Sequence, residues 1–445
     1  MTAEQPPPAK IGRRALLTGG AVSVGAALGL GAALGVGGTL GAVAIRRHSE
    51  PDAPRLTGID DTVETSAGAG GDLPGFGGEA LSCHGPHQAG IATVPAAHLR
   101  YVAYALRPET DRAALERLFR VLTDDVEGLT AGTAPLADPE PELAARPARL
   151  TVTIGVGREL VERVDPARRP PWLGALPAFD RDALDGRHDG GDLLMLMQAD
   201  DPLPIAHAAR MLDRDIRGFA DPLWTQQGFR QARGADAAGA TMRNLMGQVD
   251  ETVNPRPEDE DFDGLVWIAG GASQSAPEAD PDTRPETEPD TAWLAGGTAL
   301  VLRRIRMRLE TWDRVDRPGR ELSIGRRLSD GAPLTGGSEH TPIDFDAKNA
   351  AGLPVIPAFA HARRAHSSDP AERIVRRSAN FDDGTESGLL FACFQRDPLT
   401  QFVPIQRRLD ELDLLNEWIE HTGSAVYAIL PGFAPGDALG AALFR

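Results

Sequence analysis

The sequence predicts an α+β fold in two domains, with antiparallel sheets covered by helices. Two observations lead to this prediction. The 445 residues are 41% hydrophobic and 25% charged, which is enough for two ordinary domains with sizeable cores. In the first half, segments typical of strands and helices follow one another as strand, helix, strand, strand, helix, which is the ferredoxin-like arrangement. The second half has a similar content of strands and helices, although it shows no sequence repeat.

The first domain is expected over residues 79–235. Runs of β-branched and apolar residues predict strands, and apolar residues at helical spacing predict helices. In the first of these helices Leu115, Phe119 and Leu122 fall on one face, which is therefore expected to be buried. The expected strands cover residues 97–106, 150–156 and 193–197, and the expected helices cover residues 108–128 and 204–218.

The second domain is expected over residues 236–445. It begins with a sharp loop at 241–255, because Gly, Asp and Asn-Pro are typical of turns. Acidic stretches at 258–263 and 276–290 have the composition of solvated surface insertions. Apolar residues alternate with arginines from residue 303 onward, which predicts a half-buried strand with a solvated basic face. The arginines of this face are Arg304, Arg306 and Arg308; further strands are expected at residues 265–269, 389–394 and 424–430, and an amphipathic helix at residues 404–420.

Residues 1–45 resemble a Tat export signal. The twin arginine Arg13-Arg14 precedes a run without charge from Ala15 to Ile45, and the many glycines of this run make it only mildly apolar. A membrane-spanning helix is the alternative, since the run is long enough to cross a bilayer. We expect export to the cell envelope or the extracellular space, and leave open whether the signal is cleaved or kept as an anchor. Residues 46–78 are polar, Gly-rich and aperiodic, which predicts a flexible linker.

Charge and cysteine content exclude several classes of function. The 46 basic and 64 acidic residues give a net charge of −18, which argues against nucleic acid or an anionic membrane as the partner. Cys83 and Cys393 are outside any CxxC or CxxCH motif, which disfavours a zinc ribbon and covalent c-type haem. We expect both to be small buried hydrophobes, with a disulfide between them left open. His84 and His87 are expected to be hydrogen-bonded loop histidines, because no further ligand stands nearby.

The segment 356–396 carries the strongest candidates for a functional site. His361 follows a loop punctuated by prolines, Arg376 and Arg377 come after it, and an apolar strand follows them. An imidazole can supply an axial bond to iron, a guanidinium keeps its charge, and hydrocarbon side chains can surround a macrocycle. These residue types are the ones that a ligated haem iron requires.

Motifs from about residue 80 to the C-terminus follow one another in the order found in one family. The central motif is Arg243-Asn244-Leu245-Met246-Gly247-x-x-Asp250, followed by Asn254-Pro255. In these motifs the chain resembles the dye-decolourising (DyP-type) haem peroxidases, and most of all their exported, deferrochelatase-like branch. The other matching segments are HGPHQAGI at 84–91, LTVTIGVG at 150–157, GGTALVLRRIRMRLETWDR at 296–314, IGRRLSDGAPL at 324–334, GLLFACFQRDPLTQFVPIQRRL at 388–409 and NEWIEHTGSAVYAILPG at 416–432.

The resemblance implies two ferredoxin-like domains, with haem b (iron protoporphyrin IX) bound non-covalently and mainly by the second. His361 matches the proximal iron ligand, Asp250 the distal acid–base residue and Arg376 the distal arginine. Leu389 and Phe391 match the apolar pair above the distal face, and residues two apart on a strand point the same way. The other positions that match haem-lining segments are Glu251, Thr252, Val253, His366, Ser367 and Ser368.

One position departs from the pattern of the family. The GxxDG signature falls on residues 247–251, and its last glycine is replaced by Glu251. If this position needs a positive φ, a glutamate there costs on the order of 1 kcal/mol in backbone strain. Its side chain is also expected to add bulk and negative charge beside the haem edge. The aspartate of the signature, Asp250, is retained.

The resemblance implies a haem-dependent peroxidase. Such an enzyme reduces hydrogen peroxide and oxidises organic one-electron donors, including bulky dye-type aromatic molecules, through a ferryl intermediate. Asp250 would move a proton between the peroxide oxygens, and Arg376 would stabilise the separating negative charge. The alternative is a haem- or iron-handling component of iron uptake, with iron-uptake proteins as partners and little peroxidase turnover. A homo-oligomer is left open.

Residue type alone indicates two further roles. His361 needs a hydrogen-bond acceptor that fixes its tautomer, and Glu339 and Asp344 in the preceding loop are the candidates. Electrons from bulky donors could travel through surface aromatic residues, although each candidate is expected to belong to the core. These candidates are Trp267, Trp293, Trp312, Trp418 and Tyr427.

Overall fold

A computed structural model describes residues 76–237, 239–270 and 290–445. The expected export signal, nearly all of the expected linker and most of the second acidic insertion lie outside the described residues. Within those ranges, no helix combines the length and the apolar character needed to cross a membrane.

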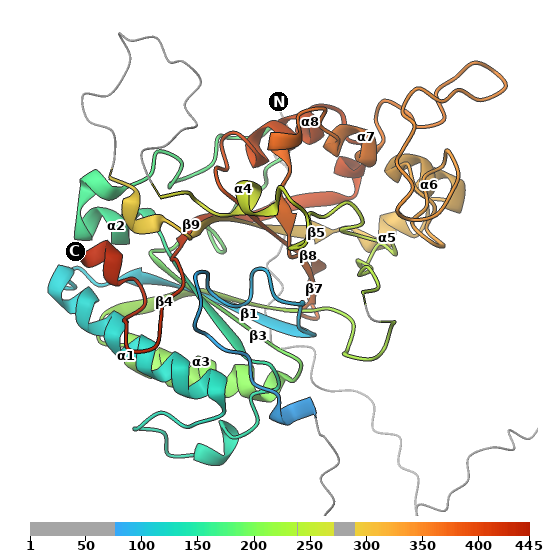
Figure 1. The fold of residues 1–445 in the computed structure, drawn as a ribbon. Helices are drawn as coiled ribbons and strands as arrows, with labels where there is room; N and C mark the ends of the chain where they lie inside the picture. Colours follow the sequence, from blue (N-terminus) through green and yellow to red (C-terminus); the bar gives the residue numbers. More distant parts are fainter. Residues whose placement is uncertain (1–75, 238, 271–289) are drawn as a thin grey trace, which may run out of the picture. The chain divides into compact units, whose positions relative to one another are not determined.

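The first half is a ferredoxin-like unit (Figure 1). Its strands pair in the order β2-β3-β1-β4, and all the pairs are antiparallel. Both long helices and three of the strands lie where the sequence predicts them, whereas the last strand was not predicted. The elements are β1 (His98–Leu106), α1 (Arg112–Ala131), β2 (Thr151–Val156), α2 (Arg158–Val164), β3 (Leu193–Ala199), α3 (Pro202–Ile216) and β4 (Ala220–Phe229).

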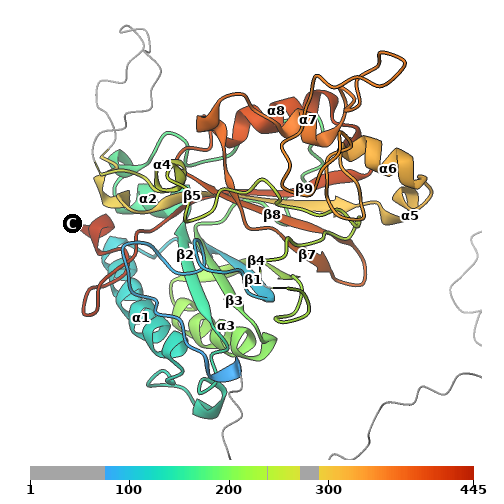
Figure 2. The ribbon, with the colours of Figure 1, turned by 45° about the vertical axis from the view of Figure 1, so that its right-hand side comes forward.

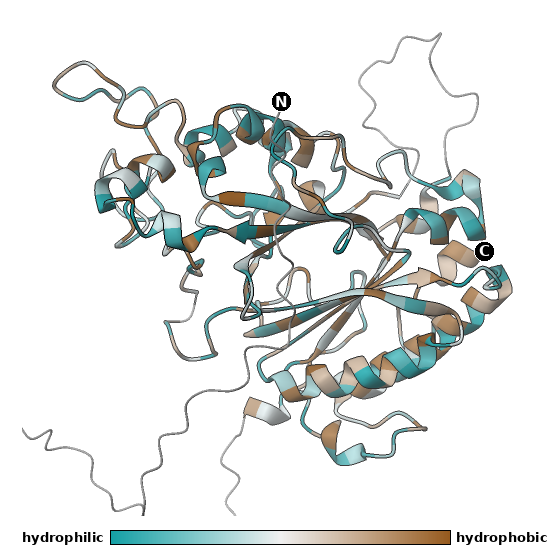
Figure 3. Cartoon of the chain, turned by 180° about the vertical axis from the view of Figure 1, so that it is seen from behind, coloured by the Kyte–Doolittle hydropathy of each residue, from teal (hydrophilic) through white to brown (hydrophobic). Residues whose placement is uncertain are grey.

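Local signals place the two long helices. Asp111 caps α1 by accepting a hydrogen bond from the amide of Ala114, and Gly132 ends it in the left-handed conformation. Asp201 caps α3 in the same way, and Pro202 occupies its first position. Both helices bury an apolar face against the sheet, and Figure 3 shows hydrophilic and hydrophobic stretches along the outer helices.

The second half repeats the same arrangement. The strands pair in the order β9-β5-β8-β7, and α8 connects β8 to β9. The short strand β6 pairs with β8 at the end of the sheet. The elements are α4 (Phe262–Val266), β5 (Thr298–Met307), α5 (Leu309–Trp312), α6 (Arg317–Ile324), α7 (His361–Ala365), β6 (Val375–Arg376), β7 (Ala379–Asp382), β8 (Ser387–Gln395), α8 (Phe402–Leu412) and β9 (Ile419–Ile429).

Two short contacts join the sheets of the two halves. β2 pairs with β9 through Gly155 and Val156, and β4 pairs with β7 through Phe229. Because β5 also pairs with β8, the ladder of strands closes on itself. Figure 2 shows the two sheets as layers, with α1 and α3 outside one and α7 and α8 outside the other. Side chains that point between the layers are therefore covered on both sides.

This closure corrects the prediction for the arginine face of β5. Arg304 is 4% exposed, so it is not solvated; it donates to Gln226 on β4 and to Thr422 on β9, and it pairs with Glu386. Only towards the end of the strand, at Arg306, does the face open to solvent. The sequence pattern alone cannot distinguish a solvated basic face from one that is buried and paired.

Other predictions in the second half need smaller corrections. Residues 265–269 were expected to form a strand, but their first residues belong to the helix α4, which begins after Asp261. The helix expected at residues 404–420 ends at Leu412, and the final strand begins earlier than expected, at Ile419. Cys83 and Cys393 are both buried and free, as expected for small hydrophobes, so no disulfide joins them.

Candidate active site

His361 is the first residue of the short helix α7 and is fixed by a buried carboxylate. Its Nδ1 lies 2.6 Å from Oδ2 of Asp413, whose side chain is 1% exposed, while 33% of the His361 side chain is exposed. Among the described residues the ring makes no other hydrogen bond. A carboxylate at Nδ1 places the ring proton there and leaves the lone pair of Nε2 available for a metal.

Asp413 therefore fills the role expected for Glu339 or Asp344, and both expectations are wrong. Glu339 accepts hydrogen bonds from the hydroxyls of Thr241 and Thr252, and Asp344 accepts them from backbone amides of its own loop. Asp413 follows α8 in the chain, and only the packing of α7 on α8 brings it to His361. Spacing in the sequence does not indicate this pairing.

Charged residues from three separate segments of the chain shift the pKa of His361. Burial lowers the pKa of His361, the charge and the hydrogen bond of Asp413 raise it, and with all neighbouring charges included the net pKa lies above its ordinary value. The charge of Asp250 raises this pKa further, and that of Arg376 lowers it.

Asp250 lies in the loop of residues 241–255, which is irregular as predicted. Its amide donates to the carbonyl of Met242 at 2.8 Å, which closes the loop, and Gly247 adopts a φ of 83°, a conformation that favours glycine. The side chain of Asn244 donates to Oδ2 of Asp250 at 3.2 Å. The other oxygen, Oδ1, faces Arg376. This carboxylate therefore has a fixed orientation and stays 17% exposed.

Arg376 ends the short strand β6 and faces Asp250. Its NH1 lies 3.4 Å from Oδ1 of Asp250, and its side chain is 24% exposed. Asn254 holds the backbone of Arg376: its Oδ1 accepts from the amide at 2.7 Å, and its Nδ2 donates to the carbonyl at 3.0 Å. The neighbouring Arg377 instead donates to the carbonyls of Ile91 and Thr93 in the first half. The structure thus places Arg376 in the site and Arg377 behind it.

Apolar and polar residues around these groups complete the site. Leu389 is buried and Phe391 half-buried, and both lie on β8, two residues apart as predicted. Thr252 is held by Glu339, and His366 packs its ring against Phe345 with a centroid separation of 4.8 Å. The exposed members of the predicted lining are Val253, His366 and Ser368, whereas Glu251, Thr252 and Ser367 are largely or partly buried.

Glu251 adopts the strained conformation that its place in the signature predicts. Its φ is 75°, in the left-handed region, which costs on the order of 1 kcal/mol for a residue with a Cβ. Its carboxylate is 7% exposed and lies 3.0 Å from Arg230, which comes directly after β4. This carboxylate also accepts a hydrogen bond from the amide of Ser378 at 2.6 Å. Its charge is therefore compensated inside the protein.

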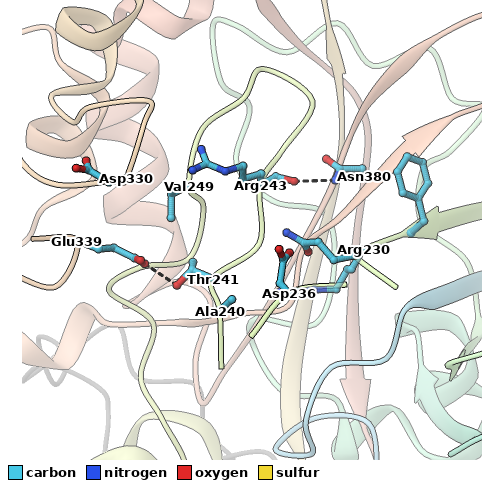
Figure 4. Close-up of a pocket in the computed structure, with 11 residues that line it drawn as sticks. Arg230, Asp236, Ala240, Thr241, Arg243, Val249, Asp330, Glu339 and Asn380 are labelled. Atoms are coloured by element: carbon cyan, nitrogen blue, oxygen red, sulfur yellow. Dashed lines mark hydrogen bonds between the residues drawn. The ribbon is translucent and has the colours of Figure 1, made fainter. Parts of the chain in front are cut away.

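A cavity of about 520 Å³ lies behind the Asp250 loop (Figure 4). Val249, Arg230 and Asn380 belong to its wall. Figure 4 shows the hydrogen bonds from Thr241 to Glu339 and from Asn380 to the carbonyl of Arg243 across this region. The cavity therefore adjoins the loop that carries Asp250 and the arginine that pairs with Glu251.

The residues present fit a haem. An imidazole whose Nδ1 is held by a buried carboxylate can bind iron through Nε2. A carboxylate and a guanidinium, those of Asp250 and Arg376, face each other at 3.4 Å, and Leu389 and Phe391 supply apolar surface on β8. His84 and His87 do not form a second centre of this kind, because His84 bonds Glu127 and His87 bonds the carbonyl of Gly296.

Comparisons with known proteins show which family the chain resembles along most of its length. Residues 88–230 match the description "Dyp-type peroxidase, N-terminal", and residues 241–434 match "Dyp-type peroxidase, C-terminal". The dye-decolorizing peroxidase of Thermobifida fusca is 38% identical over 304 residues, which are 66% of this chain and 67% of that protein. The deferrochelatase of Escherichia coli K12 is 31% identical over 86% of this chain and 91% of that protein. The crystal structure of a DyP-type peroxidase from Cellulomonas bogoriensis superposes with a TM-score of 0.75 and 44% identity, covering 83% of this chain and 99% of that one.

Proposed function

The chain belongs to the Dyp-type peroxidase family, and on that premise we propose that His361 would hold the iron of a non-covalently bound haem b. We assign Asp250 as the acid–base residue and Arg376 as the charge-stabilising residue of the facing side. The protein is a haem peroxidase, an oxidoreductase that takes hydrogen peroxide as oxidant and an organic molecule as reductant. The observation that carries the residue assignment is the Asp413–His361 pair acting together with the Asp250–Arg376 pair.

When bound, haem iron supplies the redox chemistry that splits the oxygen–oxygen bond of peroxide. Asp413 keeps the proton of His361 on Nδ1, so that Nε2 can bind. Asp250 accepts a proton from one peroxide oxygen and delivers it to the other, so that water can leave. Asn244 orients Asp250 by donating to Oδ2, while Oδ1 faces Arg376.

Arg376 supports this step by electrostatics. A guanidinium cannot lose its proton in the working pH range, so it stabilises the negative charge that develops as the oxygens separate. Leu389 is buried and Phe391 half-buried, and an apolar wall of this kind would strengthen the effect by lowering the local dielectric constant. An electrostatic contribution of this kind is commonly worth about 3 kcal/mol of barrier.

Replacement of the axial residue tests the assignment. His361→Ala should abolish the Soret band of the protein after loading with haem, because it removes the imidazole whose Nδ1 Asp413 holds. His340→Ala is the matched control, since His340 is an exposed histidine of the preceding loop. Unchanged haem stoichiometry and spectrum in His361→Ala would refute the ligand assignment.

We also propose that the protein is exported by the Tat pathway and acts outside the cytoplasm. The twin Arg13-Arg14 and the uncharged run from Ala15 to Ile45 support this proposal. Replacing both arginines with lysine should keep the protein in the cytoplasmic fraction. Export of this variant at the parent level would contradict the proposal, and the mass of the exported protein would distinguish cleavage from retention of the signal.

A second candidate function is handling of haem or iron in iron uptake. The relatives named deferrochelatase cover most of this chain, which supports the candidate. Turnover distinguishes the two functions: Asp250→Asn should remove most peroxide-driven oxidation from a peroxidase. A protein that only carries haem would show no turnover to lose.

A further inference from the structure

Two side chains of the Asp250 loop hold the backbone of the segment that carries Arg376. Asn254 accepts from the amide of Arg376 and donates to its carbonyl, at 2.7 and 3.0 Å. Ser378 lies two residues after Arg376, and its amide donates a hydrogen bond to Glu251 at 2.6 Å. The carbonyl of Ser378 accepts from Arg230 at 2.7 Å. The amides and carbonyls of both residues are thus bonded to side chains, as a neighbouring strand would bond them.

Arg377, which lies between Arg376 and Ser378, forms its backbone hydrogen bond on the other side of the segment. The amide of Arg377 donates to the carbonyl of Ala392 on β8 at 2.8 Å. In extended backbone the amides and carbonyls of successive residues point to alternate sides. The segment 376–378 is therefore an edge of the sheet, with β8 on one side and the Asp250 loop on the other.

Glu251, Arg230 and Ser378 form a closed ring of hydrogen bonds. One guanidinium nitrogen of Arg230 donates a hydrogen bond to the carbonyl of Ser378 at 2.7 Å, and the other donates to Oε2 of Glu251 at 3.0 Å. Oε1 of Glu251 completes the ring at the amide of Ser378. The side chains of Glu251 and Arg230 are 7% and 13% exposed, so this ring is largely shielded from water. A residue with a strained positive φ is kept in that conformation by its surroundings, and for Glu251 these hydrogen bonds do so.

The direct contact between Asp250 and Arg376 fixes their relative position less firmly than these hydrogen bonds do. Their atoms are 3.4 Å apart, which is long for a charge-assisted hydrogen bond. The pair therefore depends on the backbone contacts on each side of it. Glu251 is adjacent to Asp250 in the chain, and Ser378 is two residues from Arg376, so their hydrogen bond links the two groups by a short path.

We propose that Glu251 is a positioning residue that sets the geometry of Asp250 relative to Arg376. A glycine at this position, as in the signature of the family, has no side chain to reach either Ser378 or Arg230. The inference rests on the proposed roles of Asp250 and Arg376 in peroxide reduction. It predicts that restoring the signature glycine lowers activity, although this change relieves the strained φ.

Three variants of the haem-loaded full chain test the proposal. Glu251→Gly keeps the backbone conformation and removes the ring, whereas Glu251→Gln keeps an acceptor for the amide of Ser378. Asp200→Asn is the matched control, because Asp200 is also 7% exposed, lies 3.0 Å from Arg149 and accepts from a backbone amide, but lies outside the site. A structural role alone would make the glycine variant and the control behave alike.

The expected result is a selective loss. In Glu251→Gly, kcat/KM for hydrogen peroxide should fall about 10- to 100-fold, since a displacement of about 1 Å in a catalytic pair has effects of this size. The KM for the organic reductant should stay within about twofold. Glu251→Gln should recover most of the loss, and Asp200→Asn should stay within about twofold of the parent while losing thermal stability.

Amide exchange of the chain without haem gives a second readout that does not depend on activity. The amide of Ser378 should exchange at least about tenfold faster in Glu251→Gly than in the parent, and should be unchanged in Asp200→Asn. Faster exchange with unchanged kcat/KM for peroxide would overturn the positioning role and leave the peroxidase assignment intact. Unchanged exchange in Glu251→Gly would overturn the ring itself. Absence of turnover in the parent would overturn the proposed function, and the inference with it.

Discussion

Replacing Asp413 with asparagine should weaken haem binding about 10- to 100-fold, which is about 1.4 to 2.7 kcal/mol. The direction follows from the geometry. Oδ1 of Asp413 accepts from the amide of Leu415 at 3.0 Å, and the oxygen of an asparagine would keep this hydrogen bond. Its NH2 group would then face Nδ1 of His361, where Oδ2 now lies at 2.6 Å. Nδ1 would have to accept, so the ring proton would move to Nε2, the atom that must bind iron.

Titration of the protein with haem, followed at the Soret band, measures this effect. Asp165→Asn is the control for the structural part of the change, because Asp165 also caps a short 3-10 helix and accepts from the amide of Ala167 at 2.9 Å. This control should bind haem as the parent does. An unchanged Kd for haem in Asp413→Asn, in a protein that folds normally, would refute the assignment of Asp413 as the residue that fixes the tautomer of His361.

Three further predictions concern catalysis, packing and pH. Asp250→Asn should lower peroxide turnover by about 10²- to 10⁴-fold at unchanged haem content, measured by steady-state kinetics; a loss below tenfold would contradict its acid–base role. Trp312→Phe should lower the free energy of unfolding by about 1 to 3 kcal/mol in urea titrations, because the indole of this fully buried residue donates to the carbonyl of Met246, which would lose its partner. Burial, with the hydrogen bond and charge of Asp125, raises the pKa of Asp215 to about 7, so the folded protein should lose stability as the pH rises from about 4 to about 7. Asp215→Asn should remove part of this loss, on the order of 1 kcal/mol between urea titrations at about pH 4.5 and about pH 7.5, and an equal pH dependence in both proteins would contradict the shift.

Local patterns in the sequence were enough for most of the fold. The apolar face of α1 and its aspartate cap are properties of one segment, so the helix could be predicted without knowledge of its partners. The sequence does not indicate β4, because Asp221 and Pro222 look like a turn and because Leu223 and Phe229 are exposed while Gln226 is buried, so no clean alternation marks a half-buried strand. The arginines of β5 were misjudged, because whether Arg304 is solvated depends on the closure of the sheet by strands that are distant in the sequence.

The residues of the site also fall into two groups, those that sequence motifs indicate and those that only the tertiary structure reveals. His361, Asp250 and Arg376 could be proposed because their motifs are recognisable, and the structure places Asp250 against Arg376. Asp413 could not be found, since it follows His361 by 52 residues and meets it only through the packing of α7 on α8. Asn254 lay within the recognised motif but was given no role, because its hydrogen bonds to Arg376 cross 122 residues of chain.

Glu251 shows how a departure from a family pattern can be misread. The sequence correctly indicated the strain of a glutamate at a position of positive φ. It did not indicate that Arg230 and Ser378 receive the carboxylate, because both lie far from Glu251 in the sequence. The compensation of a buried charge is a property of the tertiary structure.

The most direct test of the account is a stopped-flow experiment on the haem-loaded protein with one equivalent of hydrogen peroxide at acidic pH. We expect a rapid change of the haem spectrum in the parent, and its loss or strong slowing in Asp250→Asn and in Arg376→Leu. A parent whose spectrum does not change, or variants that react as fast as the parent, would contradict the assignment of Asp250 and Arg376 to peroxide reduction.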